Sequence, residues 1–323
     1  MAAAAVVLAT VGAAARADFF LEGTDRRDVN TRHTTGILHN ASTADVLANG
    51  YIGSAYVNDA ALLSVRRPSG SAVSTAYLYN NGRVEVSSGS VDYLHAYNTS
   101  TVNISGGNFS SLNARDSSTV NFSGGDVCYY LHAYNTSTVN ISGGSVHPYL
   151  DADDSSTVNI SGGSVYQLSA NDSSAVDISG GSFYSLSARD SSTVDINDGR
   201  IYSLVAYNTS TVDISGGSID HLGSWSTNTI MLHGYDFRAT GGLSLAQFDI
   251  IEGVPQYKVI GTGILTGEWR DGTDWITTIT HNGPGATILA IPEPATLSLL
   301  ALGGLALLRR RRQRRSPDRA SDD

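Results

Sequence analysis

Three aspartates at equal intervals are the side chains that point most directly to a binding site. Asp177, Asp195 and Asp213 follow one another at spacings of 18 residues. If residues that far apart in the chain lie side by side, their carboxylates repel one another unless a cation or solvent relieves the charge. Calcium prefers carboxylate oxygens and is the one cofactor to consider. A solvated acidic stripe is the alternative, because the Gly-Gly pairs here are not followed by the G-x-D of calcium-binding rolls.

Hydroxyl side chains form a second regular set. Thr99, Thr101 and Asn103 occupy alternate positions beside Val102 and Ile104, and the pattern returns in later repeats. Regularly spaced hydroxyls on one outward face can order water. Threonine also suits a strand surface, which explains the pattern without any ligand. The threonines of this candidate binding face are Thr99, Thr101, Thr119, Thr136, Thr138, Thr157, Thr193, Thr209 and Thr211.

The Thr-x-Thr alternation resembles the faces of insect β-solenoid antifreeze proteins. This resemblance implies an ice-binding or ordered-surface-binding protein as an alternative function. The match is incomplete, because serine often replaces threonine and Ala175 interrupts the array.

Tyrosine also recurs at one position of the repeat, in Tyr97, Tyr134 and Tyr207. An exposed tyrosine near a corner can stack on a sugar ring, which would favour contact with polysaccharide. The alternative is that these rings pack over the corner itself.

Catalysis is not expected from this sequence. The chain has no G-x-S-x-G, P-loop or H-E-x-x-H motif. The corners between its strands are two or three residues long, so they cannot build the cleft in which a carboxylate would be desolvated. A carbohydrate-active β-helix enzyme remains an alternative, and it would require clustered acidic residues in a groove made with residues 223–290.

The element that must position these side chains is a repeat of 18 or 19 residues. Its most regular marker is a leucine, and such a period indicates stacked units rather than a globular core. The ten residues Asn98–Gly107 return unchanged at Asn135–Gly144, as expected if each copy packs mainly on another copy. The marker leucines are Leu94, Leu112, Leu131, Leu150, Leu168, Leu186, Leu204 and Leu222.

The local pattern of each repeat is that of β-strands. Val102 and Ile104 alternate with polar residues, which is the period of a strand with one buried face. Gly106-Gly107 permits a sharp corner, and Asp116-Ser117 is typical of a second one. Because 18 residues are too few for two helices, we predict an all-β parallel β-helix (β-solenoid) of about 18 residues per rung. Val120 should then lie beside Val139, and Leu168 beside Leu186.

The flanking regions differ in composition from the repeats. Residues 1–17 are rich in Ala, Val and Leu and end in Ala15-Arg16-Ala17, which predicts a signal peptide with a small-x-small cleavage site. We expect residues 18–77 to form an N-terminal cap with irregular first rungs. Residues 78–222 form the β-solenoid repeats, and residues 223–290 a β-rich C-terminal module.

The C-terminal residues 291–323 contain three elements in order. Pro292, Glu293 and Pro294 are followed by the apolar stretch Ala295–Leu308, for which we expect a short hydrophobic helix. This stretch is shorter than the ~20 residues of a stable membrane-spanning helix. A cluster beginning with Arg309, Arg310, Arg311 and Arg312 would hold its end in the cytoplasm.

Residues 291–315 resemble the PEP-CTERM sorting signal of Gram-negative bacteria, and residues 316–323 would be a disordered tail. The resemblance implies processing by an exosortase, transient anchoring in the inner membrane, and export to the envelope or the outside. The family is linked to exopolysaccharide and biofilm material, which makes extracellular polysaccharide a candidate partner.

The charge of the chain without its ends excludes nucleic acid as a partner. Arg16 and the residues after Leu308 hold eight of the 20 basic and three of the 30 acidic residues, so the remainder has a formal net charge of −15. Such a surface repels phosphate. We therefore expect a secreted, non-enzymatic protein of the envelope or extracellular matrix, with a structural or adhesive role.

Overall fold

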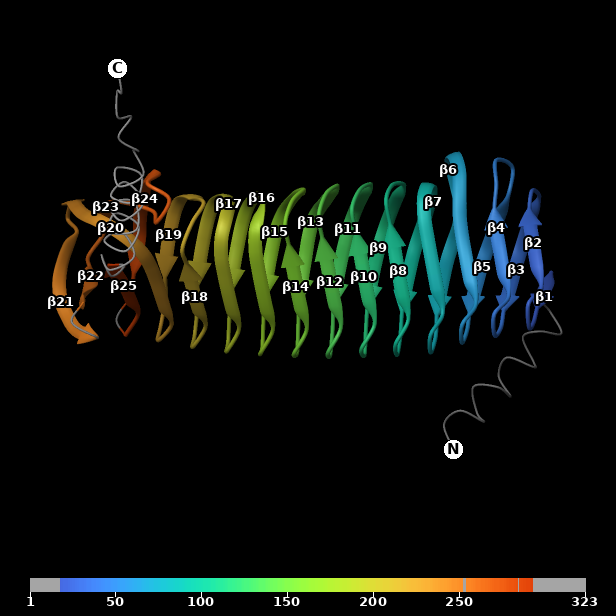
Figure 1. The fold of residues 1–323 in the computed structure, drawn as a ribbon, viewed down its shortest axis with the longest axis horizontal. Coiled ribbons are helices and arrows are strands. Elements are labelled where there is room, and N and C mark those ends of the chain that lie inside the picture. The colour runs from blue at the N-terminus through green and yellow to red at the C-terminus, as the bar shows by residue number, and fades with distance from the viewer. Residues whose placement is uncertain (1–17, 252–253, 284, 293–323) are drawn as a thin grey trace, which may run out of the picture.

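The computed structural model describes residues 18–251, 254–283 and 285–292, and within these residues the regular secondary structure is entirely β-strand. The strands wind into a β-solenoid of about 12 turns, with roughly 18 residues per rung. Figure 1 shows the resulting rod, with its first strands at one end and the last strands at the other. No helix that could cross a membrane occurs in the described part of the chain. The predicted signal peptide, the apolar helix and the C-terminal tail lie outside it.

One side of each rung is a strand that reads T-V-N-I or a close variant in the regular repeats, and together these strands form what we call the valine sheet. Its short strands are β2 (Arg26–Val29), β4 (Thr43–Val46), β8 (Thr101–Ile104), β10 (Thr119–Phe122), β12 (Thr138–Ile141), β14 (Thr157–Ile160) and β18 (Thr211–Ile214).

The other side of each rung carries the marker leucine from Leu94 onwards, and the strands of this side form the leucine sheet. The short strands here are β1 (Phe19–Leu21), β3 (Arg32–Leu38), β5 (Tyr51–Val57), β9 (Asn108–Ala114), β11 (Asp126–Ala133), β13 (Ser145–Ala152), β15 (Ser164–Ala170) and β19 (Ser218–Ser224). Four long strands pass through both sheets, namely β6 (Leu62–Leu78), β7 (Arg83–Ala96), β16 (Ala175–Ala188) and β17 (Thr193–Ala206).

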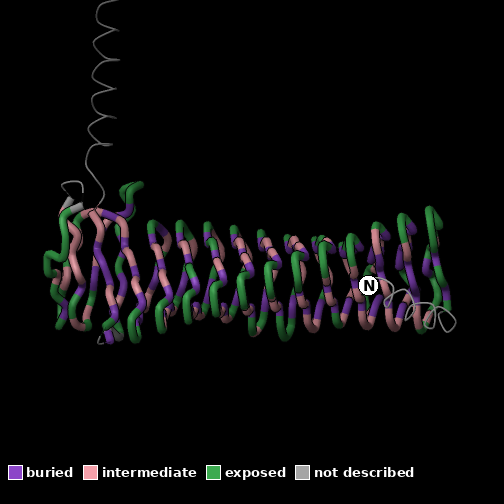
Figure 2. The backbone as a smooth tube through the Cα atoms, turned by 90° about the horizontal axis from the view of Figure 1, so that it is seen from below, coloured by how far each residue is buried: buried purple, intermediate pink, exposed green. Residues whose placement is uncertain are grey.

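Successive rungs pair in parallel and in register, as the repeat predicts. Val120 pairs with Val102 below and Val139 above, and Leu168 pairs with Leu186. The inward valines, leucines and alanines of the repeats are at most 2% exposed. Figure 2 shows buried and exposed segments alternating along each turn. The stack therefore buries one continuous column of apolar side chains per inward position.

Two kinds of corner close each rung. At the first, an asparagine or aspartate adopts a left-handed conformation, with φ of 57° at both Asn98 and Asp116. These residues tolerate that conformation because their short side chains form local hydrogen bonds. The backbone N–H of Asn98 donates to Asp116 Oδ2 of the next rung at 2.9 Å. At the second corner, Gly144 has a φ of 81°, and a Cβ there would lie 2.6 Å from the carbonyl oxygen of Gly125.

The regular stack begins earlier in the chain than the repeat indicates. Residues 18–77, for which we expected an N-terminal cap with irregular first rungs, form paired rungs from Phe19 onwards. The leucine position is taken there by Gly36, Ala55 and Ala76. The next inward position, which is alanine in later rungs, holds the larger Leu38, Val57 and Leu78. In these first rungs the small side chain stands at the leucine position and the large one at the alanine position. The volume of the core is therefore conserved, although the sequence no longer shows the repeat.

The C-terminal end of the rod is formed by a mixed sheet, which we call the cap. The rungs continue through β20 (Thr229–Gly241), and the cap strands are β21 (Ser244–Ile251), β22 (Val254–Ile260), β23 (Gly263–Glu268), β24 (Asp274–Asn282) and β25 (Thr287–Pro292). The rings of Trp269 and Trp275 stack at 4.8 Å, and Trp269 Nε1 donates to the carbonyl oxygen of Gly217 at 2.8 Å. These rings join the cap to the last rungs.

Candidate functional site

The predicted threonines fall into two structural sets. Those in the valine-sheet strands lie in register, so that Thr119 pairs with Thr101 and Thr138, and Thr193 with Thr211. Thr157 continues the column above Thr138, and Ala175 interrupts it. The strand threonines therefore form one outward column on the valine sheet.

Thr99, Thr136 and Thr209 lie instead in the corners that precede the strands. Their hydroxyls donate to backbone carbonyl oxygens of the preceding rung: Thr99 to Asn80, Thr136 to Asp116 and Thr209 to Asp190, at 2.8–3.0 Å. They connect corners of neighbouring rungs, so the flat face carries one threonine column rather than two.

Asparagines form a hydrogen-bonded ladder beside the threonine column. Asn121 Nδ2 donates to Asn103 Oδ1 at 2.8 Å, and Asn140 Nδ2 donates to Asn121 Oδ1 at 2.9 Å. Asn159 extends the ladder with a bond of 2.8 Å to Asn140. Each side-chain amide donates a hydrogen bond to the amide oxygen of the preceding rung. Such asparagine ladders stabilise stacks of identical side chains.

The three aspartates continue the asparagine column on the next rungs. Asn159 pairs with Asp177, which pairs with Asp195, and Asp195 pairs with Asp213. Partial burial, and then the charges of Asp177 and Asp213, raise the pKa of Asp195. His233 Nε2 lies 2.9 Å from Asp213 Oδ1. Within the described residues, no group of three or more His, Cys, Asp or Glu side chains could hold a metal ion.

Asp195→Asn is expected to stabilise the protein at neutral pH. The raised pKa means that ionised Asp195 destabilises the fold, and this cost develops as the pH rises from the unfolded value of 3.8 through the folded pKa. Asp195 is the middle aspartate of the three, so this substitution removes both like-charge contacts, with Asp177 and with Asp213. It should raise the free energy of unfolding by about 0.5–1 kcal/mol at pH 7. Thermal unfolding at pH 7 and pH 3.5 measures this gain, which should shrink at the lower pH.

Asp126→Asn provides the control for this prediction, because Asp126 is an exposed aspartate of the leucine sheet outside the column. It should leave the unfolding temperature nearly unchanged at both pH values. A gain for Asp195→Asn that is independent of pH would contradict the proposed repulsion.

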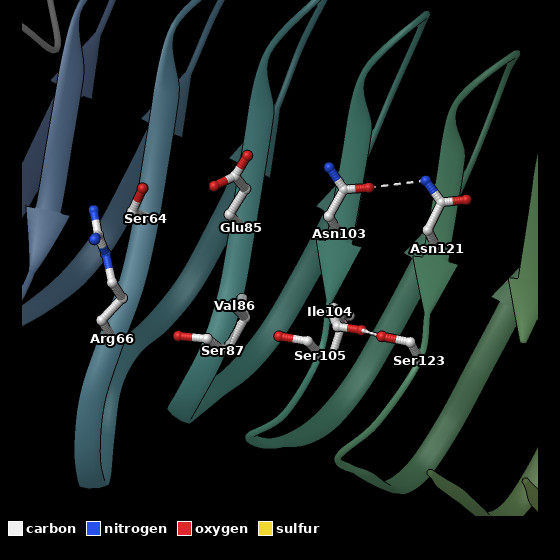
Figure 3. A pocket seen from close by; sticks show the side chains of 10 residues that line it. All are labelled: Ser64, Arg66, Glu85, Val86, Ser87, Asn103, Ile104, Ser105, Asn121 and Ser123. Carbon is white, nitrogen blue, oxygen red and sulfur yellow. Dashed lines mark hydrogen bonds between the residues drawn. The ribbon is translucent and has the colours of Figure 1, made fainter. Parts of the chain in front are cut away.

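A polar hollow of about 440 Å³ lies on the valine sheet where β6, β7, β8 and β10 run side by side. Figure 3 shows two rows of side chains along it, with Glu85, Asn103 and Asn121 in the first row. Ser87, Ser105 and Ser123 form the second row; their small side chains leave the space open. Ser123 Oγ donates to the carbonyl oxygen of Ile104 at 3.0 Å.

One end of the hollow is fixed by an ion-pair cluster. Asp45 is 2% exposed and accepts from Arg66 Nη2 at 2.5 Å and from Arg26 Nη2 at 2.8 Å. Burial raises the pKa of Asp45, but the hydrogen bond and charge of Arg66, with smaller contributions from Ser64 and Arg26, outweigh burial and lower it below its usual value. Arg66 is therefore held at the edge of the hollow while its side chain remains 56% exposed. Repeat spacing could not have revealed this cluster, because it lies before the regular copies begin.

The tyrosines predicted at a corner each have a neighbouring side chain over a ring face. Tyr97 stacks on Tyr79 at 5.2 Å, Arg115 lies over Tyr134 at 4.6 Å, and Arg189 lies over Tyr207 at 5.4 Å. Such contacts favour packing over the corner rather than stacking on a sugar. An aromatic column that sequence reasoning missed lies on the leucine sheet, where Tyr166, Tyr184 and Tyr202 stack on one another. Their spacing of 18 residues was the available signal.

A second hollow, of about 380 Å³, lies on the cap. Its lining includes three carboxylates, Asp236, Glu268 and Asp274, together with Arg238 and Trp275. The C-terminal module thus does place acidic side chains around a depression, as the enzyme alternative requires.

The predicted sorting residues begin at the end of the described structure. Pro292 is the last residue of β25, which pairs with β20 and β22 inside the cap. Glu293, Pro294 and Arg309–Arg312 lie outside the described residues. The C-terminal signal therefore continues from the cap end of the rod.

Comparison with known proteins identifies the C-terminal signal. A family model described as the PEP-CTERM protein-sorting motif matches residues 290–312. No curated protein and no solved structure matches the chain. The motif implies an exported protein that is processed by an exosortase and reaches the cell envelope or the extracellular space.

Proposed function

We propose that this exported protein is a non-enzymatic structural rod of the envelope or matrix, and that it adheres to extracellular polysaccharide through the valine sheet. The observation that carries the proposal is the hollow of Figure 3, where two rows of hydrogen-bonding side chains repeat once per rung. Rungs lie ~4.8 Å apart, so an extended sugar chain running along the rod would meet the same groups repeatedly. Many weak contacts on one chain then add up to useful avidity.

The chemistry of the hollow suits a neutral or acidic sugar chain. Serine hydroxyls and asparagine amides can both donate to and accept from sugar hydroxyls. The Arg66 guanidinium at one end can bind a sugar carboxylate through two hydrogen bonds. Glu85 is the one carboxylate among the lining residues, whereas glycoside hydrolysis uses a pair of them. This composition supports binding rather than cleavage in this hollow.

Glu85→Arg is expected to weaken retention of the protein on the exopolysaccharide of the producing bacterium. The longer side chain would fill the hollow and block its hydrogen bonds, each contributing about 0.5–1.5 kcal/mol. We therefore expect a loss of affinity of roughly fivefold or more, measured by co-sedimentation of the exported protein with the polymer.

Asp126→Arg is the matched control, since it makes the same charge change at an exposed position on the leucine sheet. It should leave retention unchanged. Equal retention of the wild type and Glu85→Arg, or no retention of the wild type, would overturn adhesion through this hollow.

The carboxylates around the cap hollow favour a second candidate function, cleavage of a polysaccharide. Asp236, Glu268 and Asp274 would supply the acid and the base or nucleophile of such a reaction. The same incubation decides between the two functions, because cleavage releases new reducing ends and binding does not. Release that disappears in Glu268→Gln would replace the structural proposal by an enzymatic one.

A further inference from the structure

Each end of the valine sheet is a strand with a free edge. Among the described residues, β2 pairs only with β4, and β21 pairs only with β22. Between them the sheet is continuous, and after β20 it passes through β25 and β22 before reaching β21. Figure 1 shows β2 and β21 at opposite ends of the rod. Free edges of this kind can pair with another strand.

The free edges at the two ends run in the same direction. β25 is parallel to β20, β22 is antiparallel to β25, and β21 is antiparallel to β22. Two reversals restore the original direction, so β21 runs parallel to β2 and to every rung between them. The cap therefore ends in an edge that could accept another rung.

The leucine sheet ends in the same way. β24 is parallel to β19, and β23 is antiparallel both to β24 and to the second half of β20, residues 235–241. That half of β20 thus again follows the direction of the rungs. At the other end of this sheet, β1 pairs only with β3. Both sheets consequently present matching parallel edges at the two ends of the rod.

The exposed ends also carry apolar side chains. Phe248 and Ile250 of β21 are 56% and 58% exposed, and Phe20 of β1 is 43% exposed. β21 contains no lysine or proline and one charged residue, Asp249, although its partner β22 contains both Pro255 and Lys258. At the opposite end of the rod, β2 contains Arg26, Arg27 and Asp28. Natural sheets commonly protect free edges with such residues. The largely apolar strand β21 is typical of a surface that contacts a partner.

We propose that copies of this protein assemble end to end, with β21 of one copy pairing in parallel with β2 of the next. The second half of β20 would face β1 in the same joint, which continues both sheets from one rod into another. The contact joins two different surfaces, so it does not close on itself and produces a filament. Backbone hydrogen bonds supply the pairing, and burial of Phe248, Ile250 and Phe20 adds to it.

The double variant Phe248→Lys/Ile250→Lys tests the cap end. Charged residues on β21 should block pairing, and because both side chains are exposed at an edge, the fold should survive. Sedimentation velocity and electron microscopy of the exported protein should show concentration-dependent filaments for the wild type. The variant should need at least a tenfold higher concentration for half assembly, with an unchanged thermal unfolding temperature.

Ile276→Lys is the matched control. Ile276 is 61% exposed and lies in the same cap, but its strand β24 has partners on both sides. This variant should assemble like the wild type. If Ile276→Lys blocks assembly as strongly as the double variant does, added charge anywhere on the cap prevents assembly, and the proposed joint is wrong.

Mixing two blocked proteins tests the polarity of the contact. Phe20→Lys should block the N-terminal end, so at a concentration where the wild type just assembles this variant and the double variant should each be monomeric alone. Mixed together they should form dimers and nothing longer, because one free cap end meets one free N-terminal end. Dimers of either variant alone would overturn the head-to-tail arrangement. A monomeric wild type would overturn assembly itself and leave residues outside the described structure as the partner of these edges.

Discussion

Replacing Leu131 by aspartate is expected to unfold the middle of the solenoid. Leu131 is 0% exposed and pairs with Leu112 below and Leu150 above. Losing a buried leucine side chain costs about 2–5 kcal/mol, and an unpaired buried carboxylate costs several kcal/mol more. For a protein of this size, a loss of about 5 kcal/mol lowers the unfolding temperature by roughly 10–20 °C. Thermal unfolding followed by circular dichroism measures the shift.

Leu131→Met is the control, because it shows whether any substitution at this position destabilises the protein as much as aspartate does. Methionine conserves most of the volume and brings no charge, so it should cost less than about 1.5 kcal/mol. Equal destabilisation by both variants would contradict the placement of Leu131 in a closely packed column.

The consequence of Leu131→Asp should be local at first. Each rung contacts only its neighbours, so stability in such an array is a sum of rungs and of their interfaces. Hydrogen exchange should therefore show lost protection first in β9, β11 and β13, the strands around the substituted rung. Uniform loss over all rungs would instead indicate that the rod unfolds as a single cooperative unit.

Replacing Pro292, Glu293 and Pro294 together by alanine should stop processing of the exported protein. The sorting motif covers residues 290–312 and implies recognition by an exosortase. Without the triplet, nearly all of the protein should keep its C-terminal residues and remain with the cell rather than reach the medium. Mass spectrometry of the C-terminus and immunoblots of cell and medium fractions measure both effects.

Thr296→Ala/Ser298→Ala is the control for the triplet, because it makes small changes in the adjacent segment and leaves Pro292–Pro294 intact. Processing should continue in this variant. Normal release of the triplet variant would mean that the triplet is not what the processing enzyme reads.

The repeat made the fold predictable where neighbouring rungs use the same side chains. Identical residues at intervals of 18 or 19 identify the vertical neighbours of Val120 and Leu168 directly. The alignment of the first rungs could not be predicted in this way. Their pairing register depends on which side chains fill the core, and those side chains are not identical to the ones in the later rungs. Ala76 stands where Leu94 stands one rung later, and Leu78 stands where Ala96 does. An alignment on leucine alone places these rungs two residues out of register.

The surface was harder to predict than the core. Alternation in Thr99–Asn103 suggested that every second residue points outward from one flat strand. Asn98 adopts a left-handed conformation, so the chain is still turning at Thr99, and the strand begins only at Thr101. The position of Arg66 at one end of the hollow depends on its ion pair with Asp45, and the repeat period does not encode that contact.

The corner chemistry described above makes the length of this protein an adjustable quantity. Each rung between Leu94 and Leu222 enters and leaves through the same two kinds of corner and offers its neighbours nearly the same faces. Duplication or loss of one 18-residue unit in the gene would change the rod by ~4.8 Å and leave both ends as they are. We therefore expect natural variants of this chain to differ in whole numbers of rungs, with fractional insertions rare.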